Sequence, residues 1–329
     1  MAETSVTKVT KVIDFVPDNW FSIKDKSSVW MRCYRIFRAS TEIRSEPKVI
    51  EFTNVVIVIL YGRVSYLDLS QVHEYVEDSN DLSFKIDMSN MKKCSTNEGT
   101  YLVLLTPFDI DGKEGDEFAV KNLLQETVGL LMSLNSRNIA FEKIFDNVTP
   151  MTGNKEQFFS PVYINPLYFT PPKLSNQQLS EVINIEKVIY SLPKEQGNRI
   201  RLSLRWFESA MRQLGVDSFL SYWIAIETLG MENSDIRPIN ESLAKIYGLS
   251  NYKEANDTFG VGRIYSLRGK IVHDGYIIPI HEQLQRYMEA LYSDILLEKL
   301  GFPSEYKTKT ILEEPDFNFQ EYVLQYLKS

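Results

Sequence analysis

The pattern of hydrophobic and polar positions divides the chain into two halves of different character. In the first half, short runs rich in β-branched and aromatic residues predict strands, over residues 8–16, 29–37, 49–60, 82–88 and 101–106. The same half is expected to hold a short helix over 69–77 and a long amphipathic helix over 117–136. Strands followed by packing helices indicate an α+β domain over residues 1–150.

The second half is predicted to be helical throughout. A stretch rich in proline and aromatic residues, 151–174, is expected to link the two domains. From residue 175 onward, apolar residues recur at helical spacing, over 175–192, 200–214, 218–231, 240–248, 263–275, 284–300 and 317–327. Gly215 is expected to cap the second of these helices and Asp217 the third. Residues 175–329 therefore predict an all-α bundle.

The helix predicted over 218–231 is apolar almost all the way round its axis. Such a helix is expected at the centre of a bundle, buried on every side. One carboxylate, Glu227, interrupts it. A carboxylate in an apolar interior is costly unless it is paired or protonated, so we expect a partner for Glu227 elsewhere in the bundle.

An arginine and a histidine stand out in the helix that ends at Gly275. The apolar stripe of this helix is predicted to consist of Val261, Ile264, Tyr265, Ile271 and Val272. Arg268 occupies a place in the stripe where an apolar residue is expected. His273, one of three histidines in the protein, follows five residues later near the helix end.

The chemistry of Arg268 and His273 suits RNA cleavage. An arginine can hold the phosphate and a histidine can move protons, while the 2′-hydroxyl of RNA is the nucleophile, so no metal is required. A spacing of five separates the side chains by roughly 140° around the helix and about 7.5 Å along it. A shared phosphate must therefore lie beyond the helix end, or a second copy completes the site. Structurally, Arg268 could instead pair with Glu227, and His273 could be a favourable cation at the helix C-terminus.

Three segments of the second half resemble the HEPN superfamily, and specifically its ApeA-like branch. They read RIRLSLRWFESAM, then Asp217 followed by FLSYWIAIETLG, then IYSLRGKIVHDG. The resemblance extends over residues 175–300. It implies a helical homodimer in which two R-x4-6-H motifs face each other. It also implies metal-independent endoribonuclease activity, used in antiphage defence or in toxin-like growth arrest.

The same resemblance implies roles for individual residues. Arg268 and His273 match the catalytic pair, and Glu227 matches an acidic residue that orients Arg268 or the partner site. Gly269 departs from the pattern, because the residue after the motif arginine is often Asn, Asp or His in active members. The alternative function is therefore a non-catalytic HEPN module that binds RNA or nucleotides, or mediates dimerisation in a regulatory complex.

Four further basic residues are candidates for contacts with RNA phosphates. Arg201, Arg205 and Arg212 share the polar face of their helix, and Lys270 lies within the motif helix. A basic stripe of this kind can follow a phosphate chain. A solvated face is the alternative, with Arg205 paired to Glu208.

Composition narrows the function classes without selecting one. The net charge of −8 argues against a general nucleic-acid-coating protein but allows a local basic site. The two cysteines lack metal-ligand spacing, and the longest apolar run, 55–60, is too short to cross a membrane. We therefore expect a cytoplasmic protein without cofactor or metal, whose first domain recognises a trigger or regulator.

Overall fold

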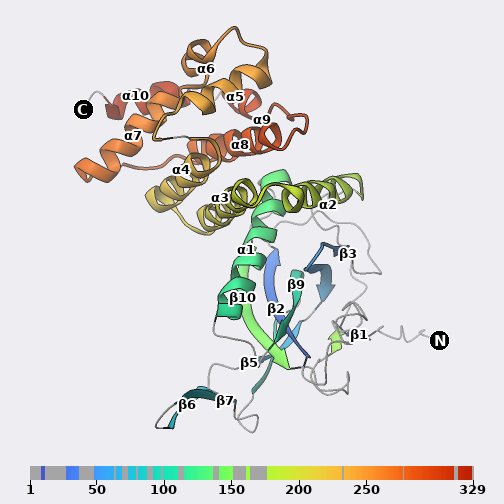
Figure 1. Cartoon of the computed structure of the whole chain (residues 1–329). Coiled ribbons are helices and arrows are strands. Elements are labelled where there is room, and N and C mark those ends of the chain that lie inside the picture. The colour runs from blue at the N-terminus through green and yellow to red at the C-terminus, as the bar shows by residue number, and fades with distance from the viewer. Residues whose placement is uncertain are drawn as a thin grey trace, which may run out of the picture. The chain divides into compact units, whose positions relative to one another are not determined.

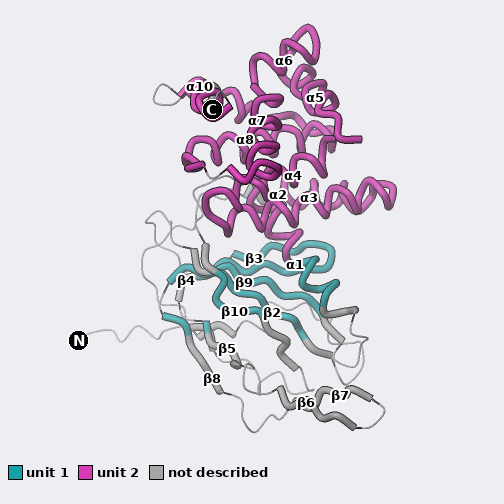
Figure 2. Tube along the Cα trace, turned by 90° about the vertical axis from the view of Figure 1, so that its left-hand side faces the viewer, with its two compact units in different colours: residues 1–124, 138–179 teal, residues 125–137, 180–329 magenta. Residues whose placement is uncertain are grey.

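The structure is a computed structural model of the chain, which divides into two compact units. It describes residues 9–11, 27–36, 48–62, 64–68, 73–78, 81–86, 92–97, 99–109, 115–135, 141–150, 161–163, 176–231, 233–276, 278–314 and 318–327. One unit comprises residues 1–124 and 138–179, and the other comprises 125–137 and 180–329 (Figure 2). The division therefore differs from the expected one, because residues 125–137 belong to the C-terminal unit.

The N-terminal unit is built on an antiparallel sheet of five described strands (Figure 1). Their order is β10 (Phe141–Pro150), β2 (Ser27–Ile36), β9 (Gly99–Asp109), β4 (Val56–Gly62) and β3 (Lys48–Glu51). The other described strands form two-stranded antiparallel sheets: β1 (Val9–Lys11) with β11 (Pro161–Tyr163), β5 (Ser65–Asp68) with β8 (Lys92–Ser95), and β6 (His73–Asp78) with β7 (Asp81–Ile86). Consecutive residues of β4 and β9 are buried, so both faces of the sheet are covered there.

A polar cluster joins β2 to β10. Asp146 accepts hydrogen bonds from the Trp30 indole at 2.6 Å and from Arg32 Nη2 at 2.8 Å. Burial raises the pKa of Asp146, but the hydrogen bond and charge of Arg32, together with the Trp30 hydrogen bond and the Lys143 charge, outweigh burial and hold that pKa below its usual value. Because Arg32 and Asp146 are directly opposed in the ladder, the ion pair also favours the observed register.

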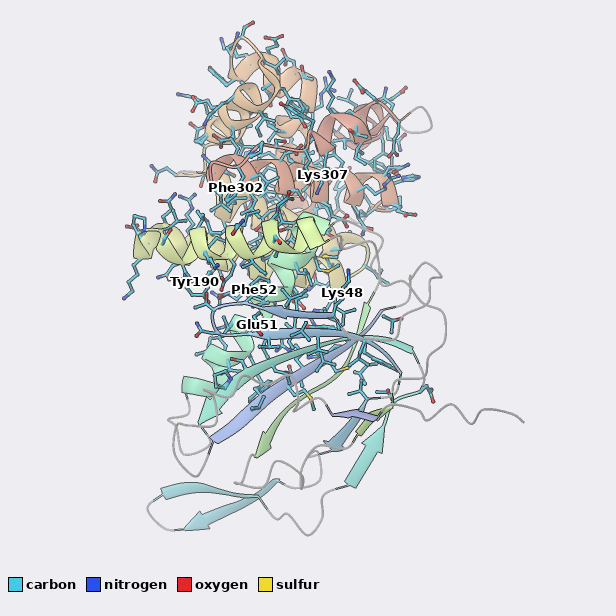
Figure 3. All side chains as sticks on the ribbon, turned by 90° about the vertical axis from the view of Figure 1, so that its right-hand side faces the viewer. Lys48, Glu51, Phe52, Tyr190, Phe302 and Lys307 are labelled. Atoms are coloured by element: carbon cyan, nitrogen blue, oxygen red, sulfur yellow. The ribbon has the colours of Figure 1, made fainter. Side chains whose placement is uncertain are left out.

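Two predictions in this unit are wrong. The apolar run 49–60 is not one strand, because the chain turns after Glu51, where the Phe52 N–H donates to the Val55 carbonyl at 2.8 Å; Figure 3 labels Glu51 and Phe52. The helix expected over 69–77 is replaced by strand β6, which pairs with β7. The pairing of Tyr75 with Phe84 shows the reason, since aromatic residues favour a strand once a partner strand is available.

The C-terminal unit is mostly helical, which confirms the coarse prediction of an α+β part followed by a helical part. Its described helices are the second half of α1 (Gly115–Asn135), α2 (Asn176–Ser191), α3 (Lys194–Arg212), α4 (Gly215–Gly230), α5 (Arg237–Tyr247), α6 (Tyr252–Phe259), α7 (Val261–Asp274), α8 (Glu282–Lys299), α9 (Lys307–Leu312) and α10 (Phe319–Leu327). None of the described helices is long and apolar enough to cross a membrane.

Helix α4 is the central helix of this unit, as predicted. It packs against α3 and α8, and its residues Phe219, Trp223 and Ile226 have no exposed surface. Phe207 of α3 stacks on Tyr292 of α8, with 4.5 Å between the ring centroids. The α1 helix also approaches α3 closely, because a side chain at Gly129 would overlap the Leu204 carbonyl.

The ends of α3 and α4 differ from the prediction. Gly215 is left-handed, with φ of 60°, but it is the first residue of α4, and the C-cap of α3 is Gln213. Asp217 lies in the first turn of α4, where its charge is favourable, and the N-cap is Leu214. Ser175, expected at the start of α2, lies outside the described residues.

Candidate functional site

The helix that carries Arg268 and His273 is delimited by two glycines. Gly260 precedes α7 and Gly275 follows it, with φ of 66° and 67°. Glycine adopts this left-handed conformation without the steric cost that a Cβ brings. The Gly275 N–H donates to the Lys270 carbonyl, which fixes the last turn of the helix and the position of His273.

The buried face of α7 differs from the predicted stripe. Its buried residues are Val261, Ile264, Leu267 and Ile271. Val272, expected in the stripe, is 48% exposed. Leu267 occupies the core position, and Arg268 lies at its edge with 26% of its side chain exposed. The Arg268 side chain is therefore partly accessible from solvent.

Helices α4 and α7 meet through two pairs of side chains. Glu227 Oε2 lies 3.9 Å from Arg268 Nη2. The ring centroids of Trp223 and Tyr265 are 5.8 Å apart. Glu227 is less buried than expected, with 24% of its side chain exposed, so it does not carry the cost of a fully buried charge. The ion pair of Arg268 with Glu227 is present, as expected both by the structural alternative and by the resemblance. The catalytic role of these residues stays a prediction.

Sequence reasoning missed the aromatic contact beside this ion pair. A signal for it exists in the spacing, since Trp223 and Glu227 are four residues apart on α4, and Tyr265 and Arg268 are three apart on α7. Residues three or four apart lie on one face of a helix. When these two faces meet, Trp223 contacts Tyr265 next to the pair of Glu227 and Arg268. Because Trp223 is fully buried, its contact with Tyr265 fixes the segment of α7 that carries Arg268.

His273 lies in the last turn of α7 and is exposed. Its imidazole has no hydrogen-bond partner within the described part of the chain. The fold thus brings Arg268 to Glu227, while helix geometry directs Arg268 and His273 to different sides of α7.

Lys270 contributes to the packing of α10 on α7. Its Nζ donates to the carbonyls of Tyr326 at 3.2 Å and Leu327 at 3.0 Å, in the last turn of α10. It also lies 5.2 Å from the centroid of the Tyr276 ring. A lysine in this position satisfies carbonyls that the end of a helix leaves free. A contact of Lys270 with RNA stays a prediction.

Two of the α3 arginines share an acidic partner from α1. Glu126 lies 3.5 Å from Arg205 Nε and 4.0 Å from Arg201 Nε. Burial raises the pKa of Glu126 to about 7, and the charges of Arg205 and Arg201 offset only part of this rise. The pairing expected between Arg205 and Glu208 is therefore wrong, because Glu126 is the partner of Arg205.

The third α3 arginine, Arg212, pairs with Glu208. Its Nε and Nη2 lie 2.6 Å and 2.9 Å from the two carboxylate oxygens of Glu208, which is fully buried. A glutamate four residues before its basic partner is a favourable arrangement on a helix. All three arginines thus lie within ion-pair distance of acidic side chains of the bundle, and their contact with RNA stays a prediction.

Comparison with known proteins does not identify a family or a function for the site around Arg268. No family model, no curated protein and no solved structure matches the chain. In the described ranges, no group of three or more His, Cys, Asp or Glu side chains is placed to hold a metal ion. The HEPN assignment therefore stays a prediction that rests on the three sequence segments.

Proposed function

We propose that this protein is a metal-independent endoribonuclease of the HEPN type. The observation that carries the proposal is the pairing of a partly exposed Arg268 with Glu227 across α4 and α7. His273, at the end of the same helix, is exposed and has no hydrogen-bond partner among the described residues. The α7 helix is anchored on its other sides by buried apolar residues and by α10, so the two side chains are held on a rigid element.

In the proposed reaction, Arg268 binds the non-bridging oxygens of the scissile phosphate and stabilises the charge that develops on them. The 2′-oxygen loses its proton to a base and attacks the phosphorus. The bond from phosphorus to the 5′-oxygen breaks, and this oxygen takes a proton. His273 is the base or the acid of this exchange. The products are a 2′,3′-cyclic phosphate and a 5′-hydroxyl.

One copy of α7 does not align the pair on a single phosphate. The five-residue spacing separates the side chains by roughly 140° around the axis. We therefore propose a homodimer in which Arg268 of one protomer and His273 of the other act on the same phosphate. The exposed Val272 beside His273 is available for the apolar part of such an interface.

The proposal is tested by incubating RNA with the full chain in excess EDTA. Arg268→Ala and His273→Ala are each expected to lower the cleavage rate by about 100-fold or more. His281→Asn is the matched control. His281 is an exposed histidine whose Nδ1 caps α8 by accepting from the Gln283 N–H at 3.1 Å, and asparagine preserves an N-cap acceptor. Cleavage at the wild-type rate in His273→Ala would contradict the assignment of His273 as the acid or base of a HEPN-type site.

Glu227→Gln separates orientation from catalysis. Glutamine keeps the size of the side chain but removes the charge that holds Arg268. The cleavage rate is expected to fall by roughly tenfold, less than in Arg268→Ala, because the guanidinium remains but is less well oriented. A fall as large as that of Arg268→Ala would instead give Glu227 a direct part in the chemistry.

We place this activity in the cytoplasm, in antiphage defence or growth arrest, with the N-terminal unit recognising a trigger. Expression in a bacterial host tests this placement. The wild-type chain is expected to inhibit growth, with or without phage infection, and Arg268→Ala to relieve the inhibition. Inhibition that persists in Arg268→Ala would exclude this site as its cause.

The second candidate function is a non-catalytic HEPN module that binds RNA or mediates dimerisation. Gly269 favours it, because the position after the motif arginine lacks a polar side chain. Apart from the chain neighbours and the nearby backbone of α7 itself, no atom of the described residues lies within 4 Å of a Cβ built at Gly269, so a larger residue fits there. Gly269→Asn is expected to raise the cleavage rate if the site is catalytic. If both the wild type and Gly269→Asn bind RNA without cleaving it, the non-catalytic module is the function instead.

A further inference from the structure

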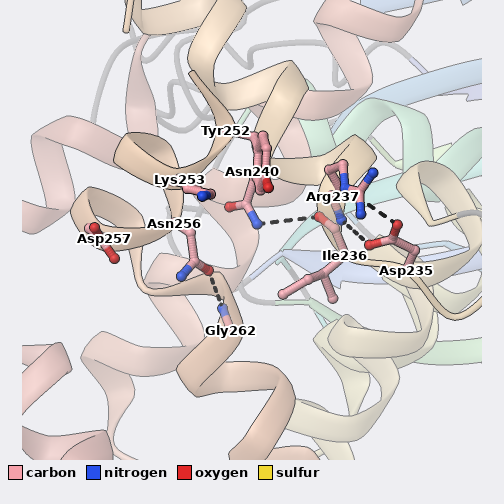
Figure 4. A pocket seen from close by; sticks show the side chains of 9 residues that line it. All are labelled: Asp235, Ile236, Arg237, Asn240, Tyr252, Lys253, Asn256, Asp257 and Gly262. Carbon is pink, nitrogen blue, oxygen red and sulfur yellow. Dashed lines mark hydrogen bonds and ion pairs between the residues drawn. The ribbon is translucent and has the colours of Figure 1, made fainter. Parts of the chain in front are cut away.

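A second candidate site lies at the start of α7. A pocket of about 390 Å³ opens between α5, α6 and the first turn of α7 (Figure 4). Its lining includes Arg237, Asn240, Tyr252, Lys253 and Asn256. Pockets for small molecules measure about 300–1,000 Å³, so this one suits a single small ligand.

One buried atom of this pocket lacks a hydrogen-bond partner. Asn240 is 2% exposed, and its Nδ2 donates to the Ile236 carbonyl at 3.3 Å. Its Oδ1 is buried and accepts from no donor in the described part of the chain. Figure 4 shows this oxygen turned away from Ile236, toward Lys253 and Asn256. Because buried acceptors in native proteins are nearly always satisfied by the protein or by an ordered water, this oxygen is an acceptor for an N–H or O–H from outside the chain.

The pocket also offers an aromatic wall. The Arg237 guanidinium lies 5.5 Å from the centroid of the Tyr252 ring, and its Nε lies 3.7 Å from Asp235. Arg237 is therefore held against the ring and neutralised by a carboxylate. Tyr252 remains half-exposed and lines the pocket, so its ring can contact a flat ligand.

Lys253 is the cation available to a ligand. It is exposed, and its ammonium group has no partner among the residues that the structure describes. Asp257, one turn later, also lines the pocket, so an anion there meets one charge of each sign. A phosphate monoester, with more negative charge than a carboxylate, remains attracted to Lys253.

Asn256 provides a second amide in the lining. Its Oδ1 accepts from the Gly262 N–H at 2.9 Å, which leaves its Nδ2 as a donor. A Cβ at Gly262 would lie 2.9 Å from the same oxygen, so this wall depends on glycine. A donor near a free acceptor is complementary to a heteroaromatic ring that carries both an N–H and a ring nitrogen or carbonyl.

We infer that this pocket binds a free mononucleotide. Asn240 Oδ1 accepts an N–H of the base, Tyr252 contacts the face of the ring, and Lys253 binds the phosphate. All four common bases carry an N–H donor, so the acceptor alone does not select among them. The inference is independent of the proposed ribonuclease activity, because neither Arg268 nor His273 lines the pocket.

The inference is tested by calorimetric titration of the full chain with AMP, CMP, GMP and UMP, and with adenosine and inorganic phosphate. At least one mononucleotide is expected to bind with a Kd below about 1 mM. The corresponding nucleoside and inorganic phosphate are each expected to bind with an affinity at least about tenfold lower, because each lacks half of the contacts.

Two variants locate the binding. Asn240→Leu removes the acceptor at similar volume and is expected to weaken mononucleotide binding by about tenfold or more. Lys253→Ala alters an exposed residue, so it keeps the fold, and it is expected to reduce the affinity to about that of the nucleoside. Lys194→Ala, on an exposed lysine of α3 outside the pocket, is the matched control.

The outcome is read from these titrations together. Absence of mononucleotide binding below about 1 mM overturns the inference. Binding that Lys253→Ala leaves unchanged also overturns it, whatever the state of Asn240→Leu. If Lys194→Ala lowers the mononucleotide affinity as much as Lys253→Ala does, the binding is a general attraction of phosphate to lysines, and the inference is overturned.

Discussion

Two glycines of α7 differ in their surroundings. A Cβ at Gly262 would lie 2.9 Å from Asn256 Oδ1. At Gly269, no described atom outside the local backbone of α7 lies within 4 Å of a Cβ. A glycine in the interior of a helix costs roughly 0.5–1 kcal/mol relative to alanine. At Gly262 this cost is offset by the contact with Asn256. At Gly269 no packing in the described structure requires glycine.

We expect Gly269→Ala to raise the free energy of unfolding by about 0.5–1 kcal/mol. Gly262→Ala is expected to lower it, because the new methyl group forces Asn256 away from α7. Urea unfolding of both variants measures the difference. Equal changes in the two variants would show that the neighbours of α7 do not distinguish these positions.

The residues of the candidate site were predictable from sequence only in part. Arg268, Glu227 and the helix end at Gly275 followed from periodicity and from the cost of an unpaired carboxylate. The prediction that Arg268 lies in the apolar stripe was wrong, and Leu267 occupies that place. The two residues are adjacent and differ by only about 100° around the helix. An apolar residue such as Val272 can also lie on the surface, so hydrophobicity alone does not define the buried face.

Among the helices, one buried carboxylate holds α9 to α8. Asp294 is fully buried. It accepts hydrogen bonds from Tyr247 Oη at 2.6 Å and Ser304 Oγ at 2.7 Å. It also accepts from the Lys307 N–H at 3.2 Å, and from the Thr308 N–H at 2.8 Å and Oγ1 at 2.6 Å. These donors come from α5, from the 301–306 connection and from the first turn of α9, so one side chain joins three segments.

We expect Asp294→Ala to lower the free energy of unfolding by about 3 kcal/mol or more, because several buried donors lose their acceptor at about 1–3 kcal/mol each. Asp294→Asn, which keeps one carbonyl oxygen, is expected to cost less. Glu305→Gln is the control, since Glu305 is 53% exposed and its loss of charge is expected to change stability by less than about 0.5 kcal/mol. A cost below about 1 kcal/mol for Asp294→Ala would contradict this role.

The elements themselves were predictable where a local pattern is strong. The continuous apolar surface of α4 predicted its central place correctly. The pattern did not reveal β6 as a strand, because its structure depends on pairing with β7. It also did not reveal α6, whose eight residues are stabilised by Asn251, an N-cap that accepts from two backbone N–H groups.

For the molecule as a whole, two acidic groups make stability depend on pH. Burial raises the pKa of Glu126 to about 7, although Arg205 and Arg201 lower it in part. Burial also raises the pKa of Glu289 to about 7, against the hydrogen bond from Tyr222. In the unfolded chain a glutamate titrates near pH ~4.3. Between about pH 4.3 and 7 each of these two groups binds more protons in the folded protein than in the unfolded chain, so its contribution to stability falls as pH rises.

Glu126→Gln tests this dependence. Glutamine resembles the protonated glutamate, so the variant and the wild type are expected to have similar Tm values near pH 5. At pH 8 the variant is expected to have the higher Tm, because the wild type then carries a buried charge. Thermal unfolding followed by circular dichroism measures the difference. Glu313→Gln, at a 67% exposed position, is expected to follow the wild type. A less stable Glu126→Gln at pH 8 would show that the pairing with Arg205 and Arg201 outweighs burial.

The division of α1 between the two units has a consequence for synthesis. The apolar residues of its second half, Val128, Leu131 and Met132, are buried within the C-terminal unit. Ser133 in the same turn receives a hydrogen bond from Ser293, 160 residues later in the chain. At about 5–20 residues per second, this partner leaves the ribosome about 8–32 s after Ser133. The end of α1 is thus made long before the helices that cover it, and we expect its apolar face to be exposed to solvent and to chaperones during that interval.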